Sequence, residues 1–550
     1  MNFLKIISLG GFGNITSNMF VYETASDILL VDCGVGFPTE EMRGVDLLVP
    51  DTTYLEDKKD KIRGIIISHG HDDHVGALPY ILPKLGKIPV YGSRWALAMI
   101  EAKTAEFNLS SDLRQVSEGT KLNLGCFTIE FIEVTHSIPE TMHLAITTPL
   151  GLFYHAADFK LDLTPVGGKP TNQNLIAAIG RRGVLCLLSD CLRAERSGFT
   201  PSEAKLEEMF EREIKDCRGR FMVTTMSSNI SRLRQAIEVA QRHNRKVVLV
   251  GRSIEENTVL ALKLGYLKFP ADLFLSIKES SKFPPEKLVF LVSGSQGQPG
   301  SALEKIVAGE REIKIEPGDK IVFSTDPIPG NEIAIYALID EIMRQGGEVC
   351  YTDIASDVHV SGHGAANDLR KLIELVRPKY LLPIGGNYRH MIAYQKIAVN
   401  LGYQKNQIIL PEDGQVVKFT ENGGLDLKEY VTTKTIMVDA LGIGDVGNVV
   451  LRDREILSKE GIVVVIIALD QTNGQLVGNP EVVTRGFVYV KESGDLLEKT
   501  KAKIKTVTNA WRGKRIDFRF IQRDIQDALE KFFFKSTGRR PMVLTQIIKV

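Results

Sequence analysis

A dense cluster of histidine and aspartate residues follows an apolar segment, and it constrains the fold more than any other feature. Residues 61–68 read KIRGIIIS, which is typical of a buried strand, and residues 69–74 read HGHDDH. Side chains alternate along an extended chain, so His69 and His71 point to the same side, while Asp73 and His74 begin a helix. Four ligand-type side chains therefore converge on a small volume. Imidazole and carboxylate groups suit Zn²⁺, and two pairs of ligands suit two ions.

The alternative is a solvated loop that happens to be rich in His and Asp. It is disfavoured because three of the ten histidines of the chain lie within six residues. Four ligands cannot complete two metal sites, so further ligands must come from elsewhere. His136 ends the strand-like segment FTIEFIEVTH and Asp158 ends GLFYHAAD. Both follow predicted strands, at the sheet edge where α/β proteins place their chemistry, and a carboxylate such as Asp158 can bridge two cations. His136 alone fits a structural role equally well, whereas together with the loop both residues support a two-metal site.

Length and composition indicate several globular domains. A chain of 550 residues exceeds the roughly 250–300 residues at which a single core usually splits. The apolar fraction of 43% and the charged fraction of 25% are ordinary globular values, which excludes disordered and fibrous classes. From residue 201, helical segments alternate with apolar strands, which predicts βαβ units on a parallel sheet. Residues from about 446 onward predict a separate strand-rich and then helix-rich domain.

Charge and cysteine usage indicate the compartment and the kind of partner. Lys plus Arg and Asp plus Glu both number 68, but residues 491–550 carry 15 basic against 7 acidic side chains, which favours a polyanionic partner. The longest apolar run, residues 462–469, is far shorter than the ~20 residues that span a bilayer. The six cysteines lie in apolar contexts without a CxxC pair, which favours reduced thiols. Glycines interrupt the N-terminal segment too early for a signal peptide. We therefore expect a cytoplasmic protein with no membrane segment.

The HxHxDH motif with a downstream His and Asp resembles the pattern of the metallo-β-lactamase fold. Longer stretches are similar to ribonuclease J, of the β-CASP nuclease branch, and the likeness covers essentially the whole chain. These stretches are THSIPET (135–141), DFKLDLTPVGG (158–168), LLSDCLRAERSGFTPSE (187–203), SSNISRLRQ (227–235), SGSQGQP (293–299), DPIPGNE (326–332), HVSGHG (359–364), GIGDVGNVVLRDR (442–454), TRGFVYV (484–490) and GRRPMVL (538–544).

The resemblance implies an α/β chain with three parts. A metallo-β-lactamase αββα sandwich is expected from residues 1–200 and from residues 351–445, the latter including a linker. A β-CASP α/β domain is expected as an insert at residues 201–350, and a small α+β C-terminal domain at residues 446–550. The implied activity is that of a metal-dependent ribonuclease, 5′→3′ exonucleolytic with endonucleolytic cuts, in RNA maturation and decay, including rRNA processing.

The resemblance also implies a role for each site residue. The first metal is expected on His69, His71, His136 and Asp158, and the second on Asp73, His74 and the shared Asp158. Two Zn²⁺ ions are expected, with Mn²⁺ or Mg²⁺ as substitutes. The expected catalytic set is Asp73, Asp190, which orients the histidine loop or water, and His363, which protonates the departing 3′ oxygen.

One departure from the family pattern concerns the second metal. The family usually has Pro-(Ile/Val)-His-Gly-Glu-Tyr-Arg, whose histidine completes that site, whereas residues 383–390 read PIGGNYRH. Gly385 has no side chain, and His390 lies over a helical turn further on, so we do not expect it to substitute. The second ion is therefore expected to bind weakly. Smaller departures are Ala157 in place of glycine and Asp326 in place of serine.

A channel for single-stranded RNA is implied between the sandwich and the insert, with a preference for a 5′-monophosphate end. The terminal phosphate contacts fall on Ser228, Asn229, Ile230, His359, Val360, Ser361, Gly362 and His363. Such small turns can offer backbone N–H groups to phosphate, although most glycine and serine turns are plain turns. Basic residues that are candidates for the RNA backbone track, each better interpreted alone as part of a solvated helix face, are Arg232, Arg234, Arg245, Lys246 and Arg252.

Two further expectations concern the C-terminal part of the chain. Asp46 and Asp439 match positions that bind a structural Ca²⁺ in relatives, for which oxygen ligands are chemically sensible. A homodimer or homotetramer is expected to form through the C-terminal domain.

Two other functions remain open from the sequence. The first is a catalytically weakened, RNA-binding paralogue paired with an active subunit, because of Gly385; the intact remaining ligands argue against it. The second is a small-molecule hydrolase of the same fold, such as a thioesterase or lactonase. The long insert and the phosphate-type turns argue against that function, since a compact pocket needs neither.

Overall fold

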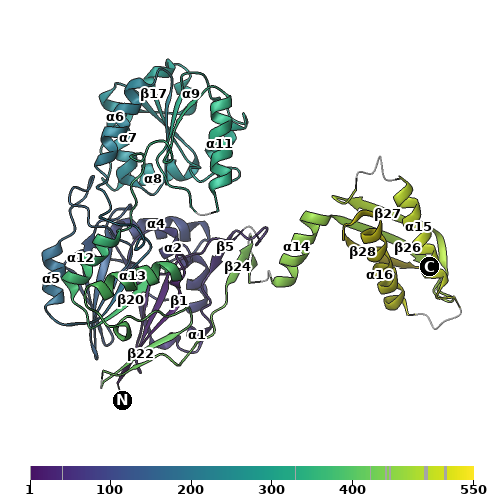
Figure 1. The fold of residues 1–550 in the computed structure, drawn as a ribbon, viewed down its shortest axis with the longest axis horizontal. Helices are drawn as coiled ribbons and strands as arrows, with labels where there is room; N and C mark the ends of the chain where they lie inside the picture. The colour runs from purple at the N-terminus through teal and green to yellow at the C-terminus, as the bar shows by residue number, and fades with distance from the viewer. Residues whose placement is uncertain are drawn as a thin grey trace. The chain divides into compact units, whose positions relative to one another are not determined.

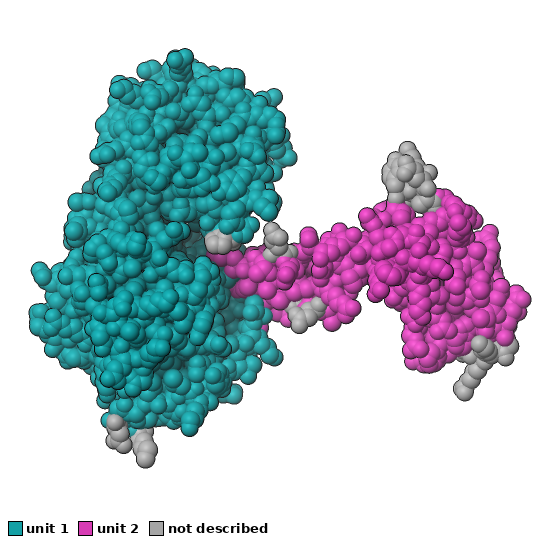
Figure 2. All heavy atoms as spheres, viewed as in Figure 1, with its two compact units in different colours: residues 1–36, 49–435 teal, residues 37–48, 436–550 magenta. Residues whose placement is uncertain are grey.

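The computed structural model describes residues 2–39, 41–328, 330–421, 423–439, 442–444, 447–488, 494–512 and 517–550. The chain divides into two compact units (Figure 2). Unit 1 comprises Met1–Gly36 and Val49–Thr435, and unit 2 comprises Phe37–Leu48 and Ile436–Val550. The expected domain boundary between residues 445 and 446 lies outside the described residues.

Two sheets stacked face to face form the sandwich of unit 1. The first has eight strands in the order β23-β22-β1-β3-β4-β6-β7-β8, and the second has six in the order β20-β13-β12-β11-β10-β9. The strands of the first sheet are β1 (Phe3–Gly10), β3 (Met19–Glu23), β4 (Ile28–Val31), β6 (Ile62–Ile66), β7 (Val90–Gly92), β8 (Leu113–Gln115), β22 (Val416–Thr420) and β23 (Leu425–Asp426). Those of the second are β9 (Lys121–Leu124), β10 (Phe127–Val134), β11 (Thr141–Thr148), β12 (Gly151–Ala156), β13 (Val184–Asp190) and β20 (Tyr380–Ile384).

The core of the sandwich lies between the two sheets. Phe20 and Tyr22 of the first sheet pack with Phe131 and Phe153 of the second in one buried cluster. Helices α5 (Gln173–Gly180), α12 (Ala366–Val376) and α13 (Tyr388–Asn400) bury their apolar residues against the other face of the second sheet. Helix α4 (Arg94–Glu106) packs on β7 and β8 of the first sheet (Figure 1). The predicted αββα sandwich is therefore confirmed.

The helix expected to begin at Asp72 is two helices. Helix α2 spans Asp72–Val75 and helix α3 spans Leu78–Leu85. Pro79 lies in the first turn of α3, where its missing N–H is harmless, but a continuous helix would need that N–H to bond to Val75. The break keeps α2 to a single turn directly after the histidine motif.

The inserted domain is a doubly wound α/β domain. Its six strands are all parallel, in the order β16-β15-β17-β14-β18-β19, as the alternating sequence pattern predicts. They are β14 (Phe221–Thr224), β15 (Lys246–Val250), β16 (Phe274–Leu275), β17 (Leu288–Val292), β18 (Lys320–Phe323) and β19 (Glu348–Cys350). One face of the sheet packs against α6 (Lys205–Asp216) and α7 (Ile230–Arg242), and the other against α10 (Ala302–Val307) and α11 (Glu332–Arg344) (Figure 1). Trp95 and Ile138 of the sandwich belong to the same buried cluster as α6 and α7, so the two domains share packing.

Unit 2 is a mixed α+β unit. Its three-stranded sheet has the order β27-β26-β28, and helices pack on one face. This sheet and its helices are α14 (Asn448–Glu460), β26 (Ile462–Leu469), β27 (Leu476–Arg485), α15 (Gly494–Asn509), α16 (Phe518–Thr537) and β28 (Met542–Lys549). The predicted order of strands and then helices is therefore wrong at both ends, where a helix precedes the strands and a strand follows the helices. Unit 2 also contains the antiparallel strands β24 (Ile436–Asp439) and β25 (Gly442–Ile443). Among the described helices of the whole chain, none combines the length and the apolarity needed to span a bilayer.

Candidate metal centre

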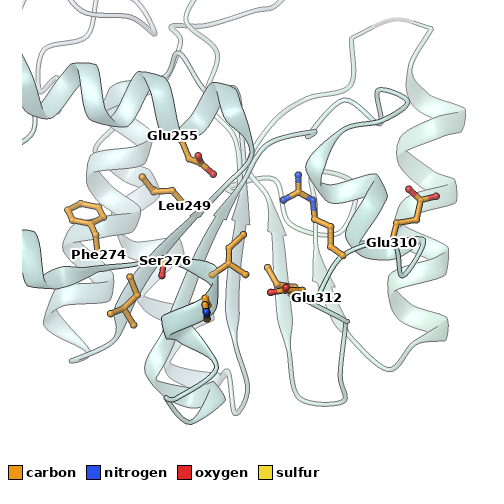
Figure 3. Close-up of a pocket in the computed structure, with 11 residues that line it drawn as sticks. Leu249, Glu255, Phe274, Ser276, Glu310 and Glu312 are labelled. Carbon is orange, nitrogen blue, oxygen red and sulfur yellow. The ribbon is translucent and has the colours of Figure 1, made fainter.

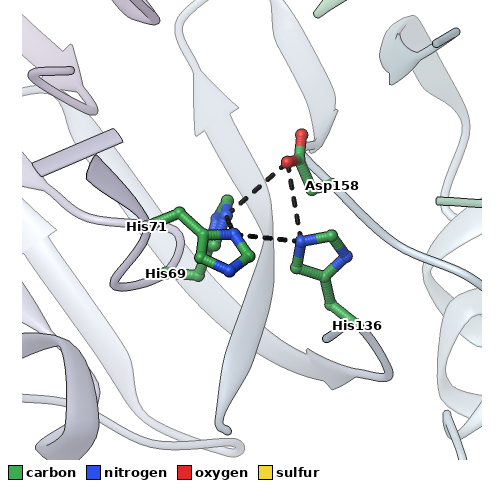
Figure 4. A group of neighbouring side chains, drawn as sticks. All are labelled: His69, His71, His136 and Asp158. Carbon is green, nitrogen blue, oxygen red and sulfur yellow. Dashed lines mark hydrogen bonds and ion pairs between the residues drawn. The ribbon is translucent and has the colours of Figure 1, made fainter. Parts of the chain in front are cut away.

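Four side chains from three separate segments meet at one edge of the sandwich. His69 and His71 follow β6, His136 follows β10, and Asp158 follows β12. Their nearest nitrogen and oxygen atoms all lie within 4.8 Å of one another (Figure 4). Nε2 of His69 is 3.6 Å from Oδ2 of Asp158, and Nε2 of His136 is also 3.6 Å from that oxygen. The structure thus brings together the four residues expected to hold the first metal.

The protonation of these four groups suits a cation. Burial lowers the pKa of His69 and His136 well below the usual range, and it lowers the pKa of His71 to about 4. Burial alone would raise the pKa of Asp158, but His363, His74 and His69 hold it well below its usual range. Neutral imidazoles and an ionised carboxylate are the forms that ligate metal ions. This donor set of three nitrogens and one oxygen fits Zn²⁺.

A second set of three ligand atoms shares Asp158 with the first. Nε2 of His74 is 3.5 Å from Oδ2 of Asp158 and 3.6 Å from Oδ2 of Asp73. Gly385 faces the shared Asp158, because a Cβ built on it would lie 3.9 Å from Oδ1 of Asp158 and 3.9 Å from Oδ1 of Asp190. The position therefore points toward the site and contributes no ligand to it.

His390 does not fill the gap left at Gly385. Its Nδ1 accepts a hydrogen bond of 3.1 Å from the backbone N–H of Asn387, at the start of α13. Its Nε2 is 3.6 Å from Oε2 of Glu195. Among the described residues, His390 belongs to none of the metal-type clusters.

Asp32 is a site residue that sequence reasoning missed. Its Oδ2 is 2.7 Å from Nδ1 of His74, so the other ring nitrogen of His74 faces Asp73 and Asp158. Ser68 donates to both carboxylate oxygens of Asp32, from its N–H at 2.7 Å and its hydroxyl at 2.8 Å. Partners that orient a metal-ligating imidazole also raise its basicity. The signal in the sequence was an aspartate at the end of the apolar segment DILLVD. This segment becomes β4, which lies next in the sheet to β6, the strand that precedes the histidine motif.

Backbone geometry around Asp32 reinforces this interpretation. Asp32 has φ +62°, which is uncommon for a residue other than glycine and is found at functional sites. Gly34 follows two residues later, and a Cβ there would lie 1.6 Å from the backbone oxygen of Asp73. Only glycine therefore allows the β4 segment to approach helix α2 this closely.

Asp190 and His363 form a pair that, together with Asp158, makes a third metal-type cluster of the described residues. Nδ1 of His363 is 2.8 Å from Oδ2 of Asp190, and its Nε2 is 3.8 Å from Oδ2 of Asp158. Burial disfavours the charged imidazole, but Asp190 and Asp158 raise the pKa of His363 to about 9. The hydroxyl of Thr200 donates to the backbone oxygen of His363 at 2.7 Å and holds the loop. A protonated imidazole is thereby aimed at the shared carboxylate.

The second of the two turns expected to bind phosphate contains His363, and part of each turn already has hydrogen-bond partners. The N–H of Asn229 bonds to Met226 O, the N–H of Ile230 bonds to Ser228 O, and the Asn229 side chain caps α7. Gly362 lies in the second turn, and its carbonyl accepts a hydrogen bond of 2.8 Å from Nδ1 of His136. This bond directs Nε2 of His136 toward Asp158.

Arg232 and Arg245 are buried, so the interpretation as a solvated helix face is wrong for both. Arg232 is 1% exposed, and its guanidinium bonds to Glu203, His359 and the carbonyls of Ser324 and Val360. Arg245 donates to the carbonyls of Gly219 and Cys217 at 2.9 and 2.7 Å. Both side chains therefore connect separate segments of the chain through buried hydrogen bonds.

The remaining candidates on that track lie on the surface of the inserted domain. Arg234 bonds to the carbonyl of Tyr266, and the Nζ of Lys246 is 3.1 Å from Oδ2 of Asp272. The backbone of Arg252 begins helix α8 (Arg252–Lys263), and its side chain is exposed.

Asp46 and Asp439 lie in unit 2. The N–H of Asp46 bonds to the carbonyl of Val438, and the carboxylate of Asp439 is paired with Arg454. Neither residue joins a metal-type cluster of the described residues. Calcium binding there stays a prediction.

A separate pocket of about 670 Å³ lies in the inserted domain (Figure 3). Its lining includes Leu249 and Phe274 and the carboxylates of Glu255, Glu310 and Glu312. Lys278 and Arg311 line it as well, and none of the metal-type residues does.

Comparisons with known families match four separate segments of the chain. Residues 13–141 match the metallo-β-lactamase superfamily, and residues 353–411 match the RNA specificity domain of Zn-dependent metallo-hydrolases. Residues 218–342 match the ribonuclease J β-CASP domain, and residues 449–550 match the ribonuclease J C-terminal domain.

Similar proteins match along their full length. Ribonuclease J2 of Bacillus subtilis is 37% identical over 551 residues, covering 100% of this chain and 99% of that protein. Ribonuclease J 1 of Streptococcus pyogenes is 34% identical, covering 100% of this chain and 98% of the relative. A crystal structure of a protein of unknown function from Enterococcus faecalis V583 aligns with a TM-score of 0.55 at 15% identity, over 76% of this chain and 100% of that one, which supports the fold alone.

Proposed function

The chain belongs to the ribonuclease J family and is a metal-dependent ribonuclease, and from this premise we propose that it degrades single-stranded RNA in the 5′→3′ direction and also makes endonucleolytic cuts. One observation carries the proposal. Oδ2 of Asp158 lies 3.5–3.8 Å from the Nε2 atoms of four histidines that come from three segments of the chain: His69, His74, His136 and His363. Such a convergence suits phosphodiester hydrolysis at two cations beside a proton donor.

In this proposal Asp158 belongs to both ligand sets. His69, His71, His136 and Asp158 would hold the first ion, and Asp73, His74 and Asp158 the second. Zn²⁺, when bound, would lower the pKa of a water and neutralise charge on the phosphoryl oxygens. Mn²⁺ or Mg²⁺ can supply the charge neutralisation in its place. Asp32 keeps His74 in the orientation that binds metal, and Gly362 does the same for His136 through its carbonyl.

His363 is the proposed general acid. Asp190 accepts the hydrogen of Nδ1, so the second N–H of the protonated ring, at Nε2, points toward the cluster, where it can be given to the departing 3′ oxygen. Asp190 also stabilises the positive charge that the ring carries before the transfer.

The RNA would enter between the sandwich and the inserted domain. The two turns at residues 228–230 and 359–363 would receive a 5′-monophosphate, and Arg232, two residues beyond the first turn, donates to the carbonyl of Val360 in the second. Their small size supports a pocket for a single phosphate. The activity would serve RNA maturation and decay in the cytoplasm, with which six unpaired cysteines are consistent.

The C-terminal domain would join two or more copies of the chain. Val464 and Ile466 of β26 point away from the helix-covered core and are half-buried. Leu544 and Ile548 of β28 are 53% and 49% exposed on the same face. An apolar sheet face of this kind supports a second copy as the partner, giving a homodimer or homotetramer.

A substrate comparison tests the proposal. The purified chain is incubated with RNA labelled at its 5′ end and, separately, with a thioester, each with and without a chelator. We expect metal-dependent release of the label as mononucleotide and no thioester hydrolysis. Metal-dependent thioester hydrolysis without RNA cleavage would overturn the proposal and favour a small-molecule hydrolase.

Gly385 favours a second candidate, a catalytically weakened RNA-binding subunit that works with an active paralogue. The two candidates differ in the cleavage rate at saturating metal. A nuclease with one weak site regains full turnover when metal is added, whereas a weakened subunit binds RNA and cleaves it slowly at every metal concentration.

A further inference from the structure

Three charged or polar side chains lie beside the turns proposed to bind the RNA 5′ end, and the mechanism gives two of them no part. We refer to Arg193, Asp326 and His359 as the rim cluster. Asp326 follows β18, and Nε2 of His359 is 3.7 Å from its Oδ2. Arg193 follows β13, and its backbone forms a bridge with Ala365, two residues beyond His363.

Asp326 is held in place by its backbone and presents its carboxylate to solvent. Gln296 is 1% exposed, and its amide nitrogen donates to the carbonyl of Asp326 at 2.9 Å. The amide oxygen of Gln296 accepts from the N–H of Ile328 at 2.8 Å, which fixes the turn after β18. The side chain of Asp326 is 50% exposed, so a negative charge stands at the edge of the proposed phosphate pocket.

His359 adds a donor to this edge and no charge. Nη1 of Arg232 donates to its Nδ1 at 2.9 Å, and a guanidinium has no acceptor, so the ring hydrogen is on Nε2, facing Asp326. Burial and the nearby Arg232 lower the pKa of His359 well below its usual range. The charge of the rim cluster therefore comes from Asp326 and Arg193.

Arg193 lacks a close partner within the described part of the chain. Its Nε is buried without a hydrogen bond, and its guanidinium forms none of the ion pairs found there within 4.0 Å. Burial lowers the pKa of Arg193, and Asp326 is the strongest influence in the other direction. Burial raises the pKa of Asp326, and Arg193 is the strongest charged neighbour that opposes this shift. A half-buried guanidinium is thus available to an incoming phosphate.

We propose that Asp326 and Arg193 set the charge of the RNA 5′ end that this protein accepts. Arg193 attracts the terminal phosphate, while Asp326 repels it in proportion to its charge and so discriminates against a triphosphate. The inference rests on the proposed binding of RNA 5′ ends at the neighbouring turns. It assigns a specificity role to two residues that belong to none of the metal-type clusters among the described residues.

Binding to three RNA ends tests the inference without relying on catalysis. Oligonucleotides of one sequence with a 5′-hydroxyl, a 5′-monophosphate or a 5′-triphosphate carry a fluorophore at the 3′ end. Their affinities for the metal-free, full-length chain are measured by fluorescence anisotropy in the presence of chelator. The variants are Asp326→Asn, Asp326→Ser and Arg193→Gln. Asp272→Asn is the control, because it also removes one negative charge. Asp272 lies just before β16, at the edge of the parallel sheet where the strands begin, whereas Asp326 lies beyond the end of a strand, at the opposite edge.

The expected result is a graded change. After salt screening, we take the loss of the Asp326 charge to change the affinity roughly 1.7-fold for each unit of charge on the RNA 5′ end. Asp326→Asn should then tighten binding of the monophosphate end about threefold and of the triphosphate end about eightfold, and leave binding of the hydroxyl end unchanged. Asp326→Ser should do the same, Arg193→Gln should weaken the charged ends in the same order, and Asp272→Asn should change none.

Two results would overturn the inference while leaving the proposed function intact. One is an equal change on all three ends, which would assign Asp326 to the internal RNA backbone. The other is unchanged affinities in both Asp326 variants, with thermal melts like that of the parent. Failure of the parent chain to bind any of the three RNAs is a different result, since it would overturn the proposed function and the inference with it.

Discussion

Restoring a side chain at Gly385 should restore the second metal site. In Gly385→His, the added Cβ would lie 3.9 Å from carboxylate oxygens of both Asp158 and Asp190, so it enters open space on the side of the ligands. The second set has three ligand atoms in the parent chain, from Asp73, His74 and Asp158. Changes to residues that only orient a ligand alter metal affinity by roughly 10–100-fold, so a new direct ligand should strengthen the second ion by at least about that factor, or about 1.4–2.8 kcal/mol.

The substitution also has a cost. Gly385 has φ +63°, a backbone conformation that costs a residue with a Cβ about 1 kcal/mol. Its N–H bonds to the carbonyl of Gly11 at 3.0 Å, which holds the backbone in that conformation. The metal-free variant should therefore unfold at a slightly lower temperature than the parent, and the metal-bound variant should not.

Gly385→Ala is the matched control, because it has the same backbone strain and no imidazole. Metal content by elemental analysis and Zn²⁺ affinity by competition with a chelating dye are measured for the parent and both variants. The parent and Gly385→Ala should hold one ion tightly and a second weakly, while Gly385→His holds two. Two equally tight ions in the parent, or equal affinities in the two variants, would refute the reasoning.

Four further predictions concern the site, the substrate and the fold. His71→Ala should reduce RNA cleavage at least about 100-fold, whereas the surface variant His243→Ala should cleave like the parent in the same assay. Asp32→Asn should weaken metal binding about 10–100-fold by releasing the ring of His74, as read by dye competition; unchanged affinity would deny Asp32 an orienting role. RNA with a 5′-monophosphate should be degraded faster than RNA with a 5′-triphosphate, and equal initial rates would contradict a pocket for one phosphate. Burial raises the pKa of Asp413 to about 6 in the folded chain, so the folded state binds a proton that the unfolded state has released, and stability should fall by about 2–3 kcal/mol as the pH rises from about 4 to about 6. In urea unfolding, Asp413→Asn should flatten the dependence of stability on pH in that range. A dependence identical to that of the parent would contradict this role of Asp413.

The local part of the site was predictable because its signal is local. His69, His71 and His74 lie within six residues, and the apolar strand before them fixes which side chains share a face. His136 and Asp158 were predictable because each follows an apolar strand and therefore emerges at the same edge of the sandwich. The parallel sheet of the inserted domain followed equally from the alternation of helices and strands.

The parts that were missed depend on contacts between distant segments. Asp32 is a single aspartate at a strand end, and only the pairing of β4 with β6 brings it to His74. Arg232 has the spacing of a helix-face residue, but Glu203 and the carbonyl of Val360 enclose it from 29 and 128 residues away. Burial of a charged side chain depends on such partners, which periodicity does not reveal.

The order in which the sandwich is completed has a consequence for synthesis of the chain. Phe3 of the first strand pairs with Thr420, and β13 pairs with β20, which is translated only after the whole inserted domain. The proposed general acid, His363, also lies beyond that domain. A nascent chain leaving the ribosome therefore carries its histidine motif early, and it gains His363 and β20 only after the whole inserted domain has been made.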